Sequence, residues 1–574
     1  MAEQDRRLSR EEVAQLEIGH TAIGRRSAWF LTLTLLACLI AVPILQTVHE
    51  WRHRDAESGW MPQYWEVWTM GAPALDAFRG SGPGLWPRMK AANAVLLERI
   101  HRYESRLEDE SILTQTLLGP TQLLLLRHLG VGNEQAYLGR DGWLFYRPGV
   151  DYCTGPGFLE AKQLARRAME GNEWTPHPQP DPVKAILDFH GQLEARGIRL
   201  ILMPTTVKPT LYWSRLAPEG TPWFEPVHNR SYATFLERLS AAGVTVFDPT
   251  EILAFAPQLK GASYFKTDTH WRPWAMERVA AELSAFVRAQ GMALEGDARW
   301  FRREHLVQGM GDIAVMLSLP EDQALFEEET AQIHPVFDAD GLPFSPDPAA
   351  EVLLLGDSFS NIFSNEEMGW GGHAGLAEQL AYALQMPVDR IIRNDSGAHA
   401  TRRMLATEMS RGRDRLAGKR VVIWQFAARE LAMGDWQMIP LPDPGSASAS
   451  PGGFLVPGMG ARRVVEGRLA AASPVPVPGS VPYKDHIRSL HLIDLVPVGG
   501  GAALEADQAV VYVWSMRDNR WTASATWEVG DRVRLELSPW SEYEGELGTI
   551  NRSDLEDFEL QLADPCWGEV PVSP

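Results

Sequence analysis

A serine at the end of an apolar run is the residue of this sequence whose setting most suggests catalysis. The segment LLLGDSFSN predicts a buried strand that enters a tight turn at Gly356, Asp357 and Ser358. Glycine permits the close turn, and a serine placed there has its hydroxyl at the carboxyl edge of a parallel sheet. Backbone N–H groups of the following helix could then stabilise an oxyanion. The alternative is that Asp357 and Ser358 only cap that helix.

A second segment, YFKTDTHW, places an acid and a base two positions apart. A serine hydroxyl is a weak nucleophile until a base removes its proton, and His270 is suited to this task near neutral pH. Asp268 would orient the imidazole and stabilise its charged form. For a lone Asp-x-His, a surface aspartate and a hydrogen-bonded histidine are the far more common explanation. We expect Asp268, His270 and Ser358 to meet at one edge of the sheet, with Trp271 packed beside the histidine.

The two segments together resemble a known family. GDSFS after a strand resembles the first block of the SGNH (GDSL-like) hydrolases, in which the serine comes first and an Asp-x-x-His comes near the end. Here the order is inverted and the spacing is Asp-x-His, which is similar to the alginate O-acetyltransferase family of the AlgJ and AlgX type. Similar segments follow the family's order within about residues 90–440: GRDGWLFY, MPTTVKPTLY, TDTHW, GDSFS and VVIWQFAARELAMGDW. The resemblance implies an SGNH-like, flavodoxin-like fold with Asp268, His270 and Ser358 as a catalytic triad.

Three residues after another strand-like run are candidates for binding the oxyanion. SGNH enzymes usually complete the oxyanion hole with a glycine N–H and an asparagine side chain. Arg393, Asn394 and Gly397 lie in IIRNDSGAHATRR and could serve this purpose. A simple turn at the end of the strand explains them equally well.

Three further residues are candidates for binding the substrate. Lys208 and Tyr212 follow the strand-like run IRLILMP and could line the cleft or be ordinary surface residues. Arg429 could bind the substrate or hold a turn. The sequence has no cysteine and histidine spacing typical of a structural zinc site, and we expect neither a metal nor a cofactor.

Strands and helices alternate over residues 131–440. The runs IRLILMPTT, VTVFDPT, EVLLLGDS and RVVIWQF have strand character, and amphipathic helical stretches separate them. This alternation predicts an α/β fold with a mainly parallel sheet and helices on both faces. The resemblance implies that residues 131–440 form an SGNH-like acyltransferase domain, and we expect residues 49–130 to form a helical extracytoplasmic segment before it.

An uncharged run determines the expected compartment. Residues 27–48 contain no charge and are numerous enough to span a bilayer as a helix. Arg25 and Arg26 precede the run, so the positive-inside tendency places residues 1–26 in the cytoplasm and the rest outside. A cleaved signal peptide would have a shorter apolar core and a small-x-small cleavage site, which we do not find. We expect a single-pass anchor in the inner (cytoplasmic) membrane and a periplasmic or extracytoplasmic catalytic domain.

The C-terminal part differs in composition. Residues 441–460 are rich in Pro, Gly and Ser and predict a linker. Short strand-like runs then predict a small all-β domain over residues 461–574, which could bind carbohydrate. Four tryptophans of this domain could form a sugar-stacking face or be divided between core and surface: Trp514, Trp521, Trp527 and Trp540.

Charge and cysteine content limit the remaining function classes. The chain has 574 residues and a net charge of -20, which argues against a nucleic-acid binder because such proteins need a basic face. Three cysteines are present, and Cys38 lies in the apolar run. Cys153 and Cys566 are the two that could pair outside a membrane, and the sequence leaves open whether they do.

The resemblance implies an O-acetyltransferase that moves an acetyl group through an acetyl-serine onto hydroxyls of an exported polysaccharide. Proteins similar to this one work beside a multi-spanning MBOAT-type acyltransferase, which would supply the acetyl groups. Two alternatives stay open: a carbohydrate acetyl esterase with the same triad, and a non-catalytic polysaccharide-binding scaffold. The sequence leaves open which polymer and hydroxyl are modified, and the oligomeric state.

Overall fold

A computed structural model describes most of the chain, which divides into two units, Met1–Gly119 and Pro120–Pro574. The described residues are 24–53, 62–80, 84–109, 111–171, 177–220, 226–255, 261–290, 299–320, 322–394, 397–443, 453–478, 481, 483–498, 504–548, 550–555 and 557–571. The expected cytoplasmic segment lies outside them up to residue 23, as do residues 444–452 of the expected linker.

The first unit is helical in its described part. Its longest helix, α2 (Arg25–His53), contains the uncharged run, and the apolar window of this helix is 0% buried. Among the described residues, α2 is the one helix that is long and apolar enough to cross a membrane, a criterion that a signal sequence also meets. The elements that follow are η1 (Gln63–Trp68), α3 (Gly71–Gly80), α4 (Leu85–Asp109) and α5 (Ile112–Leu129), the last of which continues past the boundary between the units.

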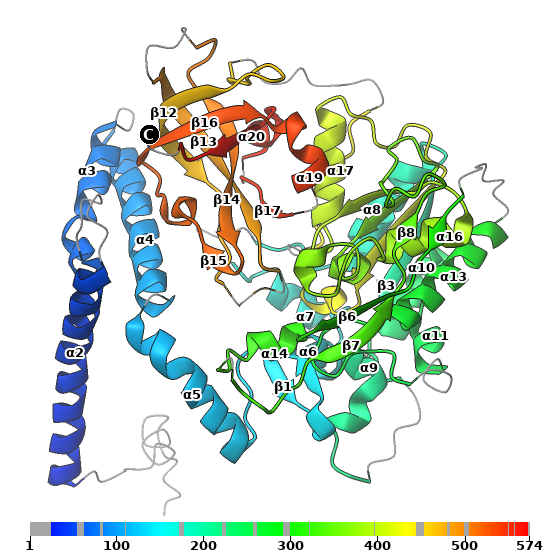
Figure 1. Ribbon diagram of the computed structural model, residues 1–574, viewed down its shortest axis with the longest axis horizontal. Helices are drawn as coiled ribbons and strands as arrows, with labels where there is room; N and C mark the ends of the chain where they lie inside the picture. Colours follow the sequence, from blue (N-terminus) through cyan, green and yellow to red (C-terminus); the bar gives the residue numbers. More distant parts are fainter. Residues whose placement is uncertain are drawn as a thin grey trace, which may run out of the picture. The chain divides into compact units, whose positions relative to one another are not determined.

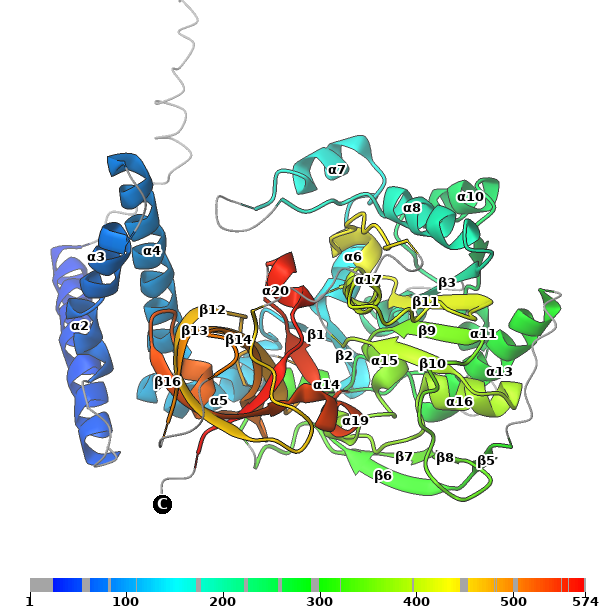
Figure 2. The ribbon, with the colours of Figure 1, turned by 90° about the horizontal axis from the view of Figure 1, so that it is seen from above.

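The α/β region contains a five-stranded sheet, of which Figure 1 labels β3. The strand order is β10-β9-β11-β3-β4, and Figure 2 labels the first four of these strands. Every neighbouring pair is parallel. The strands are β3 (Arg199–Thr205), β4 (Thr245–Val246), β9 (Val352–Gly356), β10 (Asp389–Ile392) and β11 (Val421–Ala427). β9 and β11 are buried along their whole length, as expected for continuous apolar runs inside a parallel sheet.

Helices cover both faces of this sheet, as predicted (Figure 2). Alternate residues of one strand point to opposite faces, so Leu354 of β9 joins one core and Leu355 joins the other. The first core contains residues of α13 (Pro273–Ala289) and α16 (Leu376–Leu384). The second contains residues of α8 (Pro182–Glu194), α10 (Tyr232–Ala241) and α17 (Ala400–Ser410).

Short elements surround the sheet. Two-stranded pairings join β1 (Ala136–Leu138) with β2 (Leu144–Tyr146), β5 (Phe301–Arg302) with β8 (Val336–Phe337), and β6 (His305–Gly309) with β7 (Glu329–Ile333). The short helices are α6 (Arg147–Thr154), α7 (Ala161–Arg167), α9 (Lys208–Tyr212), α11 (Thr250–Phe255), α14 (Asp312–Met316), α15 (Ser358–Asn361) and α18 (Glu430–Met433), with 3-10 turns η2 (Arg140–Gly142), η3 (Trp213–Arg215) and η4 (Glu366–Met368). α9, α15 and α18 contain or adjoin predicted site residues in the sequence.

The C-terminal region is a β-barrel. Its strands are β12 (Arg463–Ala472), β13 (His486–Pro497), β14 (Ala509–Arg517), β15 (Arg520–Trp521), β16 (Arg532–Pro539), β17 (Asn551–Ser553) and β18 (Cys566–Glu569). The order β14-β18-β16-β12-β13 closes into a ring because β13 also pairs with β14. The β character is as predicted, although short helices interrupt it: η5 (Ala523–Thr526), η6 (Trp540–Glu542), α19 (Glu544–Leu547) and α20 (Phe558–Leu562).

The four candidate tryptophans of the barrel do not gather on an exposed face. Trp540 is buried in an aromatic cluster with Trp567, and the edge of Trp514 meets the same Trp567 ring. Trp521 donates a hydrogen bond to the Pro476 carbonyl. Trp527 packs against the barrel core. Trp540 is therefore buried in the barrel, whereas Trp514, Trp521 and Trp527 are half-buried, so the four are divided between core and surface.

Cys153 and Cys566 are both free. The Cys153 thiol contacts the Thr210 hydroxyl, whereas the Cys566 thiol is buried in the barrel and donates to the Leu455 carbonyl. The two residues do not form the disulfide that the sequence left open.

Candidate active site

The turn that carries Ser358 is held by the neighbouring central strand. Gln425 of β11 accepts hydrogen bonds from the Asp357 N–H and the Ser360 hydroxyl, and it donates to the Asp357 carboxylate. Gly356 is required because a Cβ there would lie 2.5 Å from the Ser360 Oγ. Asp357 caps α15 by accepting from the Phe359 N–H. The capping role foreseen for Asp357 is thus confirmed, and it fixes Ser358 at the carboxyl end of β9.

Ser358, His270 and Asp268 meet as predicted, although 88 positions separate the serine from the histidine. The His270 Nε2 lies 2.9 Å from the Ser358 Oγ, and the His270 Nδ1 lies 2.7 Å from the Asp268 Oδ1. A carboxylate only accepts hydrogen bonds, so the ring proton belongs on Nδ1. The Nε2 lone pair therefore faces the serine hydroxyl, which is the tautomer that a general base needs. All three side chains are buried, with exposed fractions of 1–3%.

Both oxygens of the Asp268 carboxylate accept hydrogen bonds. Its Oδ1 also accepts from the His270 backbone N–H, and its Oδ2 accepts from the Trp370 indole and the Asp312 backbone N–H. These bonds hold the carboxylate in the plane from which it orients the imidazole. Trp370 and Asp312 were not identified in the sequence, because neither belongs to a recognisable motif.

Aromatic rings restrict the rotation of the His270 side chain. Phe359, the residue after the serine, meets the His270 ring edge-on at 4.8 Å between centroids. Trp271 donates a hydrogen bond to the Phe359 carbonyl and meets the Phe359 ring edge-on. Trp271 therefore acts on His270 through Phe359.

Burial and neighbouring charges shift the pKa values of the site in opposite directions. Burial alone would raise the pKa of Asp268, but the charge and hydrogen bonds of His270 outweigh it and lower the value to about 2. Burial alone would lower the pKa of His270, but Asp268 and Asp312 raise it above its ordinary value. Burial and the nearby Asp268 raise the pKa of Asp312 to about 6. A stable negative charge thus faces Nδ1 across the neutral pH range.

Lys208 and Tyr212 support the loop that carries Asp268 and His270. The Lys208 ammonium is buried and donates to the carbonyls of Phe265 and Lys266. Burial lowers the pKa of Lys208 to about 8. The Tyr212 hydroxyl accepts from the Ser263 N–H. Of the two alternatives that the sequence left for Lys208, surface residue or cleft residue, the structure excludes the exposed surface.

Arg429 lies beside the histidine. Its guanidinium sits 5.9 Å from the centroid of the Phe359 ring and 5.3 Å from that of Tyr146. Together with Lys208 and Thr269 it lines a small hollow next to His270. Its positive charge lowers the pKa of His270 against the effect of the two aspartates. Arg429 therefore lies near the histidine, and its role in substrate binding stays a prediction.

Arg393, Asn394 and Gly397 lie after β10, next to β9 in the sheet, and they point to different partners. The Asn394 Oδ1 accepts from Asn361 in the helix that begins with Ser358, and the Asn394 amide nitrogen is buried with no partner among the described residues. Arg393 pairs with Asp554 of the barrel at 3.3 Å. Gly397 has φ +75°, so it serves a turn that favours glycine. Asn394 is thus the member of this group whose free donor lies in the same small network as the Ser358 helix.

Asp268, His270 and Asp312 each have an atom that could bind a metal ion, and these three atoms lie within 4.8 Å of one another. The Asp268 Oδ2 receives two N–H groups, and its Oδ1 receives a third N–H and the imidazole Nδ1–H. N–H donors aimed at both oxygens repel a cation. The arrangement suits proton transfer better than metal binding.

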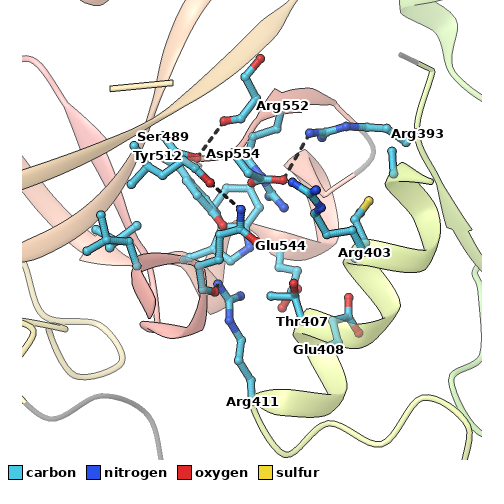
Figure 3. Close-up of a pocket in the computed structure, with 18 of the residues that line it drawn as sticks. Arg393, Arg403, Thr407, Glu408, Arg411, Ser489, Tyr512, Glu544, Arg552 and Asp554 are labelled. Carbon is cyan, nitrogen blue, oxygen red and sulfur yellow. Dashed lines mark hydrogen bonds and ion pairs between the residues drawn. The ribbon is translucent and has the colours of Figure 1, made fainter. Parts of the chain in front are cut away.

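A separate cavity of about 230 Å³ lies between α17 and the barrel (Figure 3). Figure 3 shows the Arg393 side chain ion-paired to Asp554 at its edge. The charged residues that line it are Arg393, Arg403, Arg411, Arg413 and Arg552 with Glu408, Glu544 and Asp554. Arginine is thus in excess in this cavity, although the whole chain carries a net charge of -20. Ser358 and His270 do not line it, but Arg393 is the chain neighbour of Asn394.

Residues 136–428, more than half of the chain, match the family described as SGNH hydrolase-like domain, acetyltransferase AlgX. The chain is 29% identical over 237 residues to the probable alginate O-acetylase AlgJ of Pseudomonas aeruginosa, covering 40% of this chain and 53% of that one. It is 25% identical over 314 residues to the protein of the same name from Pseudomonas putida, covering 53% and 71%. The chain therefore spans about half the length of the first of these relatives.

Two solved structures are similar at low sequence identity. The O-acetyltransferase domain of Pseudomonas putida AlgJ is 22% identical, with a TM-score of 0.40 over 52% of this chain and 92% of that one. Pseudomonas aeruginosa AlgX is 15% identical, with a TM-score of 0.40 over 70% and 91%. Because the family match covers residues 136–428, more than half of its length, the chain belongs to the AlgX-type family of SGNH hydrolase-like acetyltransferases.

Proposed function

We propose that this protein is an O-acetyltransferase that carries an acetyl group on Ser358 and delivers it to hydroxyls of an exported polysaccharide. One observation carries the proposal: His270 lies between the Ser358 hydroxyl at 2.9 Å and the Asp268 carboxylate at 2.7 Å, in a buried site. That geometry gives a serine a base and gives the base an orienting acid.

In the first half of the reaction, the Ser358 oxygen attacks the carbonyl carbon of an acetyl donor while the His270 Nε2 takes the serine proton. The carbonyl oxygen becomes an oxyanion, and the new C–O bond forms before the donor bond breaks. His270 then gives its proton to the leaving group, and acetyl-serine remains. Asp268 stabilises the imidazolium throughout and takes no proton, in keeping with its pKa of about 2.

In the second half, a sugar hydroxyl gives its proton to His270 and attacks the acetyl carbonyl. The Ser358 oxygen leaves, recovers the proton from His270, and the acetyl ester is now on the sugar. Water in place of the sugar would give hydrolysis with the same residues, which is the esterase alternative. The choice between the two depends on which hydroxyl reaches the acetyl-serine first.

Two donors are proposed for the oxyanion: the Ser358 backbone N–H and the Asn394 side-chain amide. The support for Asn394 is its buried amide nitrogen, which has no partner among the described residues, and its hydrogen bond to Asn361. A donor that is already in place and shielded from water is worth most when charge develops on the carbonyl oxygen.

The acceptor is proposed to be an alginate-like, uronate-containing polysaccharide. The relatives AlgJ are named as probable alginate O-acetylases. The arginine excess in the cavity that Arg393 lines supports an acidic acceptor, because guanidinium groups bind carboxylates in a two-pronged geometry. An acidic polymer would otherwise be repelled by a chain of net charge -20.

We further propose that α2 anchors the protein in the inner membrane with the rest of the chain outside the cytoplasm. A single spanning helix cannot carry acetyl groups across a membrane, so a multi-spanning acyltransferase of the MBOAT type is the proposed partner. Arg25 and Arg26 before the apolar run support the orientation.

The test measures turnover of p-nitrophenyl acetate by the purified protein, with and without uronic acid oligosaccharides. Mass spectrometry then shows whether the sugars carry acetyl groups. We expect acetylated oligosaccharide from the wild type and none from Ser358→Ala. Ser364→Ala is the matched control, since the Ser364 hydroxyl donates to Glu378 rather than to His270. Hydrolysis without any acetylated sugar would identify an esterase, and a folded but inactive wild type would leave the scaffold alternative.

A further inference from the structure

A second carboxylate lies on the Nδ1 side of the histidine. The Asp312 Oδ2 is 3.7 Å from the His270 Nδ1, and Asp312 is part-buried, with 7% of its side chain exposed. Ser358 lies on the Nε2 side of the same ring. Two carboxylates therefore face one edge of the imidazole, while the nucleophile faces the other.

Asp312 is tied to the histidine loop by bonds that run in both directions. Its Oδ1 accepts from the Thr269 N–H at 2.6 Å, and its own N–H donates to the Asp268 Oδ2 at 3.1 Å. Gly311, the residue before it, has no room for a side chain, because a Cβ would lie 2.3 Å from the Thr267 carbonyl carbon. The two backbones abut, so the position of Asp312 and that of His270 are fixed together.

Charged groups from several elements face this pair. Asp268 lies on the same loop as His270. The Lys208 ammonium of α9 interacts electrostatically with the carboxylates of Asp268 and Asp312. Glu329 of β7 acts on Lys208 and pairs with Arg272 of the loop. The positive charge of Arg429, which precedes α18, lowers the pKa of His270. Asp312 therefore adds a negative charge to a cluster that already contains both signs.

We infer that Asp312 is a positioning residue for acyl transfer: it fixes the backbone of the His270 loop and stabilises the imidazolium that forms when Nε2 takes the serine proton. The inference rests on the proposed function of Ser358 and His270. The proton moves from the Ser358 oxygen to Nε2 and no proton moves to Asp312. Its contribution is electrostatic and geometric, whereas Asp268 makes the direct hydrogen bond to Nδ1.

The direction of the effect on pH dependence follows from the charges. Asp312 is ionised above its pKa of about 6, and its charge helps raise the pKa of His270. Removing that charge lowers the pKa of His270, so the neutral base persists to lower pH. The acidic limb of the kcat/KM profile then moves to lower pH, while the plateau falls because the imidazolium is less stabilised.

The experiment compares wild type and Asp312→Asn for the hydrolysis or transfer of p-nitrophenyl acetate across pH. Asparagine keeps an oxygen for the Thr269 N–H and removes the charge. We expect kcat to fall roughly tenfold with the donor KM unchanged, and the acidic midpoint to fall by roughly half a pH unit or more. Should Asp312→Asn be unstable in a thermal melt, Asp312→Ser, which is smaller and also uncharged, takes its place.

Glu277→Gln is the matched control. It removes a part-buried carboxylate on α13 that pairs with His334 and Arg302 rather than with the loop that carries His270. We expect this variant to change stability without moving the acidic midpoint. A lower rate in Asp312→Asn with the wild-type midpoint would overturn the inference, because it would show only a structural role.

A second measurement separates this inference from the proposed function. The pKa of His270 is measured by NMR in the Ser358→Ala background, with and without Asp312→Asn. A lower imidazole pKa in the double variant supports the electrostatic part even if the wild type proves inactive. An unchanged imidazole pKa overturns the inference even if acyl transfer by Ser358 is demonstrated.

Discussion

Gln425 accepts a hydrogen bond at 3.0 Å from the N–H of Asp357, 68 positions earlier, so a glutamine of the central strand holds the turn that carries Ser358. Its amide nitrogen also donates to the Thr205 hydroxyl on the next strand. One side chain thus connects three neighbouring strands at their carboxyl ends.

Replacing Gln425 by alanine should lower both stability and turnover. The change leaves the Asp357 N–H and the Ser360 hydroxyl without their acceptor, and each buried unpaired group costs about 1–3 kcal/mol. Thermal melts and kcat with p-nitrophenyl acetate measure the two effects. Gln379→Ala is the control, since Gln379 is also buried and donates to the His334 carbonyl away from the serine. It should lose stability but keep kcat, and equal loss of kcat in both variants would contradict the assignment.

The rate should rise with pH through a midpoint above the ordinary histidine value of about 6.5. His270 must be neutral to act as a base, and Asp268 and Asp312 raise its pKa against the effect of burial. In Asp268→Asn the midpoint should fall, and the rate should drop by roughly 10⁴-fold, as expected when the tautomer is no longer enforced. A kcat/KM profile from pH 4 to 9 measures both quantities. A wild-type midpoint below the ordinary value would show that burial dominates.

Asn394→Ala should reduce kcat by roughly 10²–10³-fold with little change in the donor KM, because an oxyanion donor acts mainly in the transition state. The alanine also removes the acceptor for Asn361, so thermal stability is measured in parallel. Asn365→Ala, which removes a helix cap at the Glu367 N–H, is a comparison that perturbs the same region without an oxyanion donor. If Asn394→Ala retained wild-type kcat, the oxyanion hole would have to be sought elsewhere.

Asp554→Asn should destabilise the protein and do so in a pH-dependent way. Burial would raise the pKa of Asp554, but Arg552 and Arg393 outweigh it and lower the pKa. A group with a lowered folded-state pKa stabilises the fold above its unfolded value of about 3.9, and this stability is lost as pH falls through the folded value. The difference in Tm between wild type and variant should therefore be full at pH 7 and shrink below about pH 4.

Asp494→Asn provides the control for that experiment. Asp494 pairs with Arg468 on the surface, where 58% of its side chain is exposed, and such pairs contribute little. Its Tm should match that of the wild type at every pH.

Reporter fusions test the proposed topology. Alkaline phosphatase joined after Val48 should be active, and a fluorescent protein that folds only in the cytoplasm should be dark at the same position. This expectation rests on Arg25 and Arg26, which precede the uncharged run of α2 and favour a cytoplasmic N-terminus. The opposite pattern would place the acyltransferase domain in the cytoplasm.

The sequence predicted the parallel sheet and the meeting of Ser358, His270 and Asp268, because each lies in a local pattern that a family resemblance could recognise. Asp312 and Trp370 escaped prediction because they reach the site from distant segments with ordinary local sequence. Gln425 lies in the predicted strand VVIWQF, but its hydrogen bonds to the serine turn arise only from the pairing with the neighbouring strand. Lys208 was left open because a lysine after a strand is usually exposed, and only tertiary packing reveals the carbonyls that surround it. The barrel strands were foreseen, but their closure depends on non-local pairing that alternation of residue types does not encode.

The last strand of the barrel has a consequence for how the chain matures. β18 (Cys566–Glu569) inserts between β14 and β16, running parallel to one and antiparallel to the other. The ring therefore cannot close during synthesis until the ribosome has passed residue 569, and two open strand edges wait for it meanwhile. Open edges invite pairing with the wrong partner. The parallel sheet, complete at β11, can form earlier, so the barrel needs protection from wrong pairing for longer than the sheet does.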